Sequence, residues 1–542
     1  MISPHPNLSR QYLPLIMSGV ILAMVLLGCV MGIILTLLFT GGIDVLSLWA
    51  TSDRILATLK SAGIQASLSA FLSVIIGFVG AYALYYRPHW PGQKLLLQLG
   101  FIAMILPTTV AALALTSLWG RTGIFRQSLE HLFGQDILFD AYGLEMVVLA
   151  HIFFNAPLVM RVALSCLQAI PQNQLKLASQ LGFSRMVRFQ VMEAPALLPL
   201  IPSLLGLIFL LCFSSFSLVL MLGGGPSVTT LEVAIYTSVR FEFDLPTAAI
   251  LSVIQLICSA AVILVLSVMT SVNWTTHIRP THQIIWTDNR LAQLLDGGVI
   301  LALWVMFAAP VMMLVIRSDL AAGLGIIYSP DFWDAAFSSL YLGLSASIIS
   351  VCLSLWLAAA RYRLAQRRHI SVFRHLISLS VSVYLVVPSI VLGTASFIWL
   401  RGWIDIFSSA FWLVLAANVA MGLPFASRIL AGRYETLTAR TDRLCQMLNI
   451  KGLRRLWHVT LPGMHIELGL ALGLTAALSF GDLGVITLFG SDSFRTLPLM
   501  LYQYSARYGA AEADILALVM LAMALLLYGG FTILCRQLGR RS

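Results

Sequence analysis

The sequence predicts an all-α integral membrane protein with about twelve transmembrane helices, arranged as two parallel six-span repeats. The first observation is composition: 59% of the 542 residues are hydrophobic, 10% are charged and the mean hydropathy is +0.91, whereas soluble domains carry about 25% charged residues. The second is a series of long apolar runs, and the third is a segment that occurs twice. Because lipid offers no hydrogen bonds to the main chain, apolar runs of this kind must be helical.

Each predicted span is an apolar run near the length of about 20 residues that crosses the hydrocarbon core. The first run is too long for a signal-peptide core and no small-residue cleavage site follows it, so we expect it to remain as a span. The runs lie near 13–40, 58–86, 95–118, 143–166, 196–222, 246–272, 294–316, 333–360, 371–400, 411–430, 463–490 and 511–535.

The basic residues predict the orientation. The loop "RYRLAQRRHISVFRH" at 361–375 has five arginines and no acid, and most of the other basic residues fall in loops of the same side. Loops rich in Lys and Arg stay in the cytoplasm. We therefore expect both termini in the cytoplasm, and we attribute the net charge of +10 to these loops and the lipid headgroups that they face rather than to nucleic-acid binding.

The segment "LASQLGFSRMVRFQVMEAP" at 177–195 matches "LCQMLNIKGLRRLWHVTLP" at 444–462. Gly182 falls on Asn449 and Pro195 on Pro462, a shift of 267 positions (449 minus 182). Six predicted spans separate the copies, so both lie on the same side of the membrane, as in a parallel duplication.

This repeat divides the chain into segments with different expected roles. They are an N-terminal span and outer loop (1–57), a first permease module (58–272) with a loop at 168–195, a cytoplasmic linker (273–293), a seventh span and outer loop (294–332), a second module (333–535) with a loop at 432–462, and a cytoplasmic tail (536–542).

The first copy of the repeated loop predicts two short helices. Pro171 suits a helix start, and Gly182 suits the left-handed residue that ends a helix. Between them, Leu175, Ala178 and Leu181 are spaced to share one face. Ser184 suits the cap of a second helix that ends before Pro195.

The second copy predicts the same plan, with Asp442 near the cap, Leu444 and Leu448 on the apolar face, and Asn449 at the stop. Amphipathic helices that only anchor a loop in the interface are the alternative. The Gly/Asn-to-Pro interval of 13 residues in both copies favours a docking knob of fixed shape, because lipid imposes no spacing.

The repeated pattern resembles the "EAA" loop of the permeases of binding-protein-dependent ABC importers. The resemblance implies the type I ABC importer permease fold, two copies of a cytoplasmic ATP-binding subunit, and a periplasmic substrate-binding protein. Lys176 and Arg443 replace the glutamate of the family motif. The implied ATPase-coupling residues are Lys176, Ala178, Gly182, Pro195, Arg443, Cys445, Asn449 and Pro462.

Three segments, at 151–161, 216–236 and 478–503, look like the fused permeases of thiamine and thiamine pyrophosphate importers of Gram-negative bacteria. That resemblance implies a multi-pass protein of the bacterial inner membrane that moves thiamine-class molecules by alternating access. A ferric-iron ABC permease and an ion-coupled secondary transporter are the alternatives. The sequence has no GxxxxGK[ST] loop, so we expect no enzyme and no cofactor in this chain, with ATP bound by the partner subunit.

One carboxylate stands out among the candidate pathway residues. Asp482 interrupts an apolar run, and intramembrane acids usually face protein or a water-filled cavity. A pathway role near a cationic substrate and a packing or outer-rim role both remain open. The repeat aligns Phe480 with Phe213 and Asp482 with Ser215, so the predicted pathway residues are Phe213, Ser214, Ser215, Phe480 and Asp482.

Other reactive side chains predict little chemistry. We expect His151, a lone imidazole in span four, to hydrogen-bond a neighbouring helix. The seven cysteines predict no disulfide framework, and no His, Cys, Asp or Glu cluster has metal-ligand spacing. We therefore expect neither catalytic residues nor a metal site.

Overall fold

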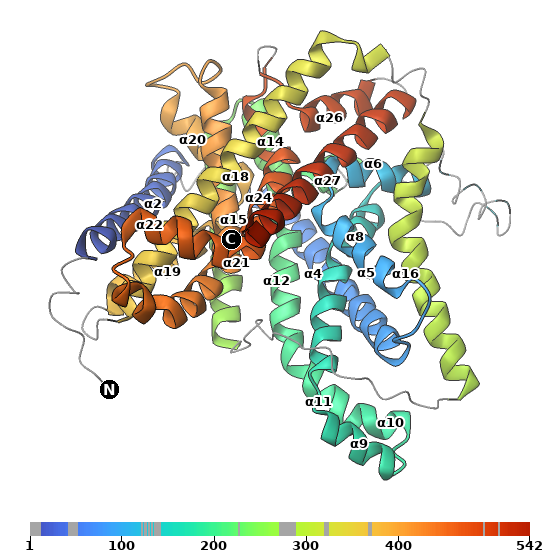
Figure 1. Cartoon of the computed structure of the whole chain (residues 1–542). Coiled ribbons are helices and arrows are strands. Elements are labelled where there is room, and N and C mark those ends of the chain that lie inside the picture. Colours follow the sequence, from blue (N-terminus) through green and yellow to red (C-terminus); the bar gives the residue numbers. More distant parts are fainter. Residues whose placement is uncertain are drawn as a thin grey trace.

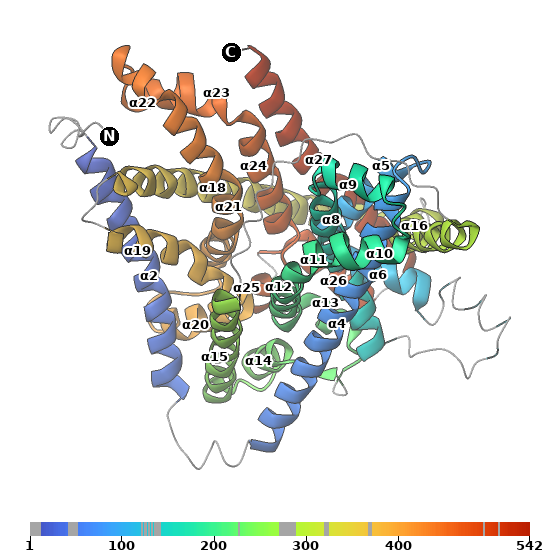
Figure 2. The same cartoon turned by 90° about the horizontal axis from the view of Figure 1, so that it is seen from below.

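A computed structural model describes residues 12–41, 52–120, 142–225, 228–269, 289–318, 325–366, 371–491, 494–507 and 510–541, together with four single residues between 121 and 141. The described residues form an all-α structure, seen from two directions in Figures 1 and 2. The predicted fold class is confirmed.

The first half contains α2 (Leu13–Gly41), α4 (Ser52–Tyr86), α5 (Gln93–Ile105), α6 (Thr108–Trp119), α8 (Leu144–Gln168), α9 (Gln172–Gln180), α10 (Arg185–Arg188), η2 (Phe189–Glu193), α11 (Ala194–Leu197), η3 (Leu198–Leu200), α12 (Ile201–Phe213), α13 (Ser217–Leu222), α14 (Leu231–Arg240) and α15 (Leu245–Met269).

The second half contains α16 (Arg290–Arg317), α18 (Pro330–Ala365), α19 (Ser371–Ser382), η5 (Val383–Leu385), α20 (Ser389–Leu400), α21 (Ala410–Met447), α22 (Gly452–Arg455), η6 (Leu456–Thr460), α23 (Leu461–Gly463), α24 (His465–Phe480), α25 (Gly484–Phe489), α26 (Leu497–Arg507) and α27 (Ala510–Arg541).

Twelve segments of the described chain are long and apolar enough to cross a membrane, and each corresponds to a predicted span. Ten are single stretches, and two are pairs of helices with a sharp bend between them. The axes of α5 and α6 differ by 118°, and those of the α19–η5 segment and α20 by 98°. Pro107 and Pro388 stand directly before α6 and α20, where their missing N–H groups cost no helical hydrogen bond.

The bent α5–α6 pair still crosses from one side of the molecule to the other. Gln93, at the start of α5, donates to the Leu84 carbonyl, near the end of α4 that contacts the first repeated loop. At the end of α6, Ser117 donates to Asp514 and its carbonyl accepts from Arg317. Since α16 has its other end at the first loop, through Asp296 and Arg185, Arg317 marks the opposite face.

The bent segment of the second half crosses in the same way. It begins just after α18, whose Arg363 contacts the second repeated loop, and it ends ten residues before α21, which runs into that loop. The two bends are therefore breaks inside spans. With twelve crossings, the two repeated loops lie on one face of the protein.

The first helix of each half packs on the core of the other half. Helix α2 contacts the second-half helices α18, α19 and α20 as well as α15, whereas α16 contacts the first-half helices α4, α5 and α6 as well as α27. The two helices lie at opposite edges of the molecule in Figures 1 and 2. The exchange ties the halves together along two sides.

Some helix ends differ from the expected segments. The part of the predicted linker 273–293 up to residue 288 lies outside the described residues, and α16 already begins at Arg290. The predicted tail at 536–542 is helical through Arg541, because α27 continues without a break. Hydropathy alone places such ends within only a few residues.

The crossing pattern makes a topological prediction. In a cysteine-free background, Ser408→Cys, between α20 and α21, should react with a membrane-impermeant maleimide from one side of the membrane, and Lys451→Cys, in the second repeated loop, from the other. Gln190→Cys in the first loop is the matched control and should behave as Lys451→Cys does. Labelling of Ser408→Cys and Lys451→Cys from the same side would contradict the twelve crossings.

Candidate functional site

The two repeated loops share one backbone geometry. Gly182 has φ +64° and Asn449 has φ +51°, so the predicted left-handed stops are confirmed. In the first loop, Phe183 N–H donates to the Ala178 carbonyl at 3.0 Å; in the second, Ile450 N–H donates to the Cys445 carbonyl at 2.8 Å. This bond is typical of the Schellman motif, which satisfies the last carbonyls of a helix.

The chain after the stop differs from the prediction. Ser184 does cap α10, accepting from Val187 N–H, but the helical course does not end before Pro195. It continues as η2, a π-helical segment, and then through α11 and η3 into α12. The second loop has a π-helical segment at the equivalent place, η6, before Pro462. A wider π turn releases the main-chain bond that each proline cannot make.

The helix before the stop differs between the copies. Helix α9 is separate from α8 and begins after Pro171, as predicted. In the second half α21 runs without a break from Ala410 to Met447, so Asp442 lies inside a helix and not near a cap. The equivalent of Pro171 is Thr438 (171 plus 267), which can continue a helix where Pro cannot.

Both loops expose large apolar side chains at equivalent positions. They are Leu177 and Leu444, Leu181 and Leu448, and Met186 and Leu453, each more than half exposed. Leu175 and Ala178 are buried, as expected for a face that packs on the body, but Leu181 is not, and Leu444 and Leu448 point outward. An apolar patch kept on both loops is typical of a protein contact surface.

The other predicted coupling residues differ in how exposed they are. Lys176, Arg443 and Pro195 are exposed and Pro462 is half-buried, whereas the small residue Cys445 is buried like Ala178. The basic side chains that replace the family glutamate therefore lie on the surface of each loop.

The second loop is anchored by a buried carboxylate between two arginines. Asp442 on α21 accepts two hydrogen bonds from Arg363 of α18, at 2.8 and 2.9 Å, and another from Arg455 of α22. All three residues are buried. Burial lowers the pKa of Arg455 and its hydrogen bonds to Asp442 raise it, with a net upward shift. These contacts fix α22 relative to a membrane helix.

The first loop is anchored by the equivalent arginine with different partners. Arg188, 267 positions before Arg455, is buried and donates to the Tyr86 hydroxyl, which donates to Glu193. Arg185 forms a bidentate pair with Asp296 of α16 at 2.7 and 3.1 Å. The first loop therefore takes its main ion pair from the second half of the chain. α9 and α10 project at the lower edge of Figure 1.

Away from the loops, the two halves share a second kind of break. Helix α12 ends at Phe213 and α13 begins at Ser217; α24 ends at Phe480 and α25 begins at Gly484, again 267 positions on. Phe213 and Phe480 are buried, whereas Ser214, Ser215 and Asp482 in the breaks are partly exposed. The predicted pathway residues thus occupy equivalent interruptions of two spans.

The break at Asp482 touches both bent spans. A side chain on Gly481 would clash with Pro107, at the first bend, and one on Gly484 would clash with Ser389, beside the second bend. Asp482 Oδ1 accepts from Gly484 N–H at 3.1 Å, while buried Oδ2 has no hydrogen-bond partner among the described residues.

A second acid, on α14, interacts electrostatically with Asp482. Glu232, in the first turn of α14, is fully buried, and neither of its carboxylate oxygens has a hydrogen-bond partner in the described part of the chain. Helix α14 packs against α25. Burial, and secondarily the charge of Asp482, raise the pKa of Glu232 to about 8.

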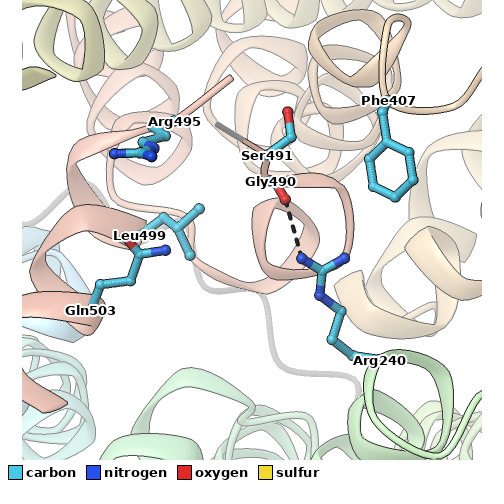
Figure 3. A pocket seen from close by; sticks show the side chains of 7 residues that line it. All are labelled: Arg240, Phe407, Gly490, Ser491, Arg495, Leu499 and Gln503. Atoms are coloured by element: carbon cyan, nitrogen blue, oxygen red, sulfur yellow. Dashed lines mark hydrogen bonds between the residues drawn. The ribbon is translucent and has the colours of Figure 1, made fainter. Parts of the chain in front are cut away.

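A cavity of about 310 Å³ lies at the other end of α14, on the face opposite the repeated loops. Residues from both halves line it: Arg240, Phe407, Gly490, Ser491, Arg495, Leu499 and Gln503. Figure 3 shows Arg240 reaching across to the Gly490 carbonyl, a bond of 3.4 Å. Arg495 also forms an ion pair with Asp331 at 3.6 Å.

His151 has the role that its sequence context predicts. Its Nδ1 lies 2.6 Å from Gln65 Nε2 and 3.1 Å from Ser69 Oγ, both on α4. The seven cysteines are free thiols.

The sequence analysis gave Asp442 a different role and did not single out the other anchoring residues, Arg363, Asp296 and Glu193. Their partners are distant in the chain, so no local pattern connects them. One signal was present: Arg188 and Arg455 align under the shift of 267, and a matched buried arginine needs an acceptor in both halves.

Comparison with known proteins identifies the family. A "Thiamine transport system permease protein ThiP" of Brucella abortus (strain 2308) is 38% identical over 464 residues, covering 85% of this chain and 84% of the relative. The chain belongs to the family of thiamine transport system permease proteins. The family relatives of Escherichia coli (strain K12) and Haemophilus influenzae are 36% and 30% identical, covering 88% and 89% of each chain. No family model matches the sequence.

Membership of this family, together with the apolar helices, makes the chain a multi-pass permease of the inner membrane. This family assignment agrees with the resemblance to thiamine permeases seen in the segments at 151–161, 216–236 and 478–503.

The anchor of the second loop predicts a stability effect. Asp442→Asn leaves two buried guanidinium groups without a counter-charge, so we expect the free energy of unfolding to fall by about 3–5 kcal/mol. Denaturant unfolding of the purified permease measures the loss. Glu435→Gln is the control. Glu435 is also on α21, and it forms a partly exposed ion pair with Arg361 of α18. Such an exposed pair contributes only about 0–1 kcal/mol to stability. Equal effects of the two substitutions would contradict the anchoring role.

Proposed function

We propose that this chain is the permease subunit of an ATP-driven importer that moves thiamine and thiamine pyrophosphate from a periplasmic binding protein into the cytoplasm by alternating access. The observation that carries the proposal is the 36–38% identity to thiamine transport permeases over at least 85% of the chain. The twelve crossing segments and the duplicated loop support a transport role.

In this proposal each repeated loop docks one copy of a cytoplasmic ATP-binding subunit. The equivalent exposed side chains Leu177 and Leu444, and those one turn further on, support a shared contact surface. The Schellman turns at Gly182 and Asn449 set the angle of the segment that follows. The loops and both termini then lie in the cytoplasm, consistent with the basic bias of this side.

We further propose that the two modules, 58–272 and 333–535, line a pathway between them, with Phe213, Ser214, Ser215, Phe480 and Asp482 along it. The paired helix breaks support this arrangement, because irregular backbone at membrane depth is tolerated where it is covered by protein or lines a cavity. The cavity at the opposite face would then be the outer mouth, where the periplasmic binding protein delivers substrate.

Uptake measurements separate the thiamine proposal from its alternatives. Vesicles containing the permease with its ATPase, and supplied with the binding protein and ATP, should accumulate labelled thiamine, and should not accumulate ferric ion. Uptake of iron and not thiamine would establish the ferric alternative. Uptake driven by a proton or sodium gradient without ATP would establish a secondary transporter.

The left-handed turns predict a coupling defect. Gly182→Val and Asn449→Val each force a β-branched residue into a conformation that costs an L-residue about 1–2 kcal/mol, although the space around Gly182 is open. We expect each to weaken ATPase pull-down and substrate-stimulated ATP hydrolysis, and the double variant to be far worse than either.

Asn449→Gly is the matched control, because glycine adopts the same φ without strain, and it should retain coupling. If the double valine variant binds and stimulates the ATPase as the native chain does, the loops are interfacial anchors and not docking knobs.

A further inference from the structure

Glu232 and Asp482 form an unusual pair because each comes from a different half and neither has a counterpart. Under the shift of 267, Asp482 corresponds to Ser215 and Glu232 corresponds to Leu499. Duplication alone therefore does not explain either acid. Helix α14 packs on α25, which begins two residues after Asp482, so the two acids lie on elements that are in contact across the boundary between the halves.

The pair lacks a counter-charge within the described residues. Both oxygens of Glu232 and Oδ2 of Asp482 are buried without a hydrogen-bond partner there. Arg240, on the same helix as Glu232, lies eight residues away, about 12 Å along the axis, and contacts Gly490 at the cavity. Without a cation nearby, a buried acid of this kind avoids the cost of an unpaired charge by staying protonated. A cation beside the pair would favour the ionised carboxylates and gain their hydrogen-bonding oxygens.

The position of the pair suits a moving ligand. Asp482 occupies a helix break, and its neighbours Gly481 and Gly484 pack on the residues at the two proline bends, Pro107 and Ser389. The contact of Gly481 with Pro107 joins the two halves, and the contact of Gly484 with Ser389 lies within the second half. A change in how the halves pack would therefore alter access to the acids directly. Helix α14 also connects Glu232 to the lining of the cavity through Arg240.

We propose that Glu232 and Asp482 form a two-carboxylate site for a flat organic cation at the boundary between the halves, filled by the thiazolium ring of the cargo when the halves separate. This deepens the proposed function and rests on it. The ligand's positive ring supplies the charge that the protein itself does not place beside the acids.

The test compares thiamine with a neutral analogue of the same shape, in which carbon replaces the ring nitrogen of the thiazolium. Uptake is measured in vesicles with the ATPase and one common binding protein, for the native permease, Glu232→Gln, Asp482→Asn and the double variant. Dividing the kcat/KM for thiamine by that for the neutral analogue, and comparing this preference between variants, cancels the contribution of the binding protein.

We expect each neutralised carboxylate to reduce the preference for the cation by about tenfold, since close buried charge pairs contribute at least about 1.5 kcal/mol. Glu242→Gln is the control, because Glu242 follows the same helix but forms an exposed pair with Arg54, and it should leave the preference unchanged.

Equal loss of both substrates would show that the acids only support packing, and would overturn the inference. An unchanged preference would overturn it as well. If the double variant is inactive, the single variants decide the question. Failure of the native permease to take up thiamine would instead refute the proposed function, so the two failures are distinguishable.

Discussion

The structure depends on the requirement that main-chain N–H and C=O groups find partners away from water. Four interruptions break the helices of the spans: the proline bends before α6 and α20, and the gaps after Phe213 and Phe480. The contacts of Pro107 with Gly481 and of Ser389 with Gly484 bring three of these interruptions together. Protein rather than lipid covers them, so the spans can break in the interior.

The number and positions of the spans could be predicted from sequence, because a twenty-residue apolar run has few other uses. The bends could not. The prolines were visible in "ILPTTV" and "VVPSIV", but a proline in an apolar run is compatible with a mild kink or with a bend near 100°. Only the residues packed around it decide between them.

The repeated loops show the same limit at residue level. Local rules placed the left-handed stops at Gly182 and Asn449 correctly, since few other residues adopt that conformation. The same rules placed Asp442 near a cap, which was wrong, and they did not indicate that Leu181 is exposed while Leu175 and Ala178 are buried. Asp442 is held by hydrogen bonds from Arg363 and Arg455. The apolar residues in and just after α9 lie on two faces, one buried and one exposed. The function of the exposed face stays a prediction.

Helices α2 and α16 each pack on the opposite half of the chain, and this arrangement affects how the protein folds during synthesis. As the first half leaves the ribosome, α4, α5 and α6 lack the helix that covers them, and Arg185 of the first loop lacks Asp296. Both arrive only with α16, after the linker. Helix α2 in turn lacks its packing partners α18, α19 and α20 until the second half has been synthesised. The first six spans are thus an incomplete folding unit, and fusing the halves into one chain places each missing helix within reach of its site.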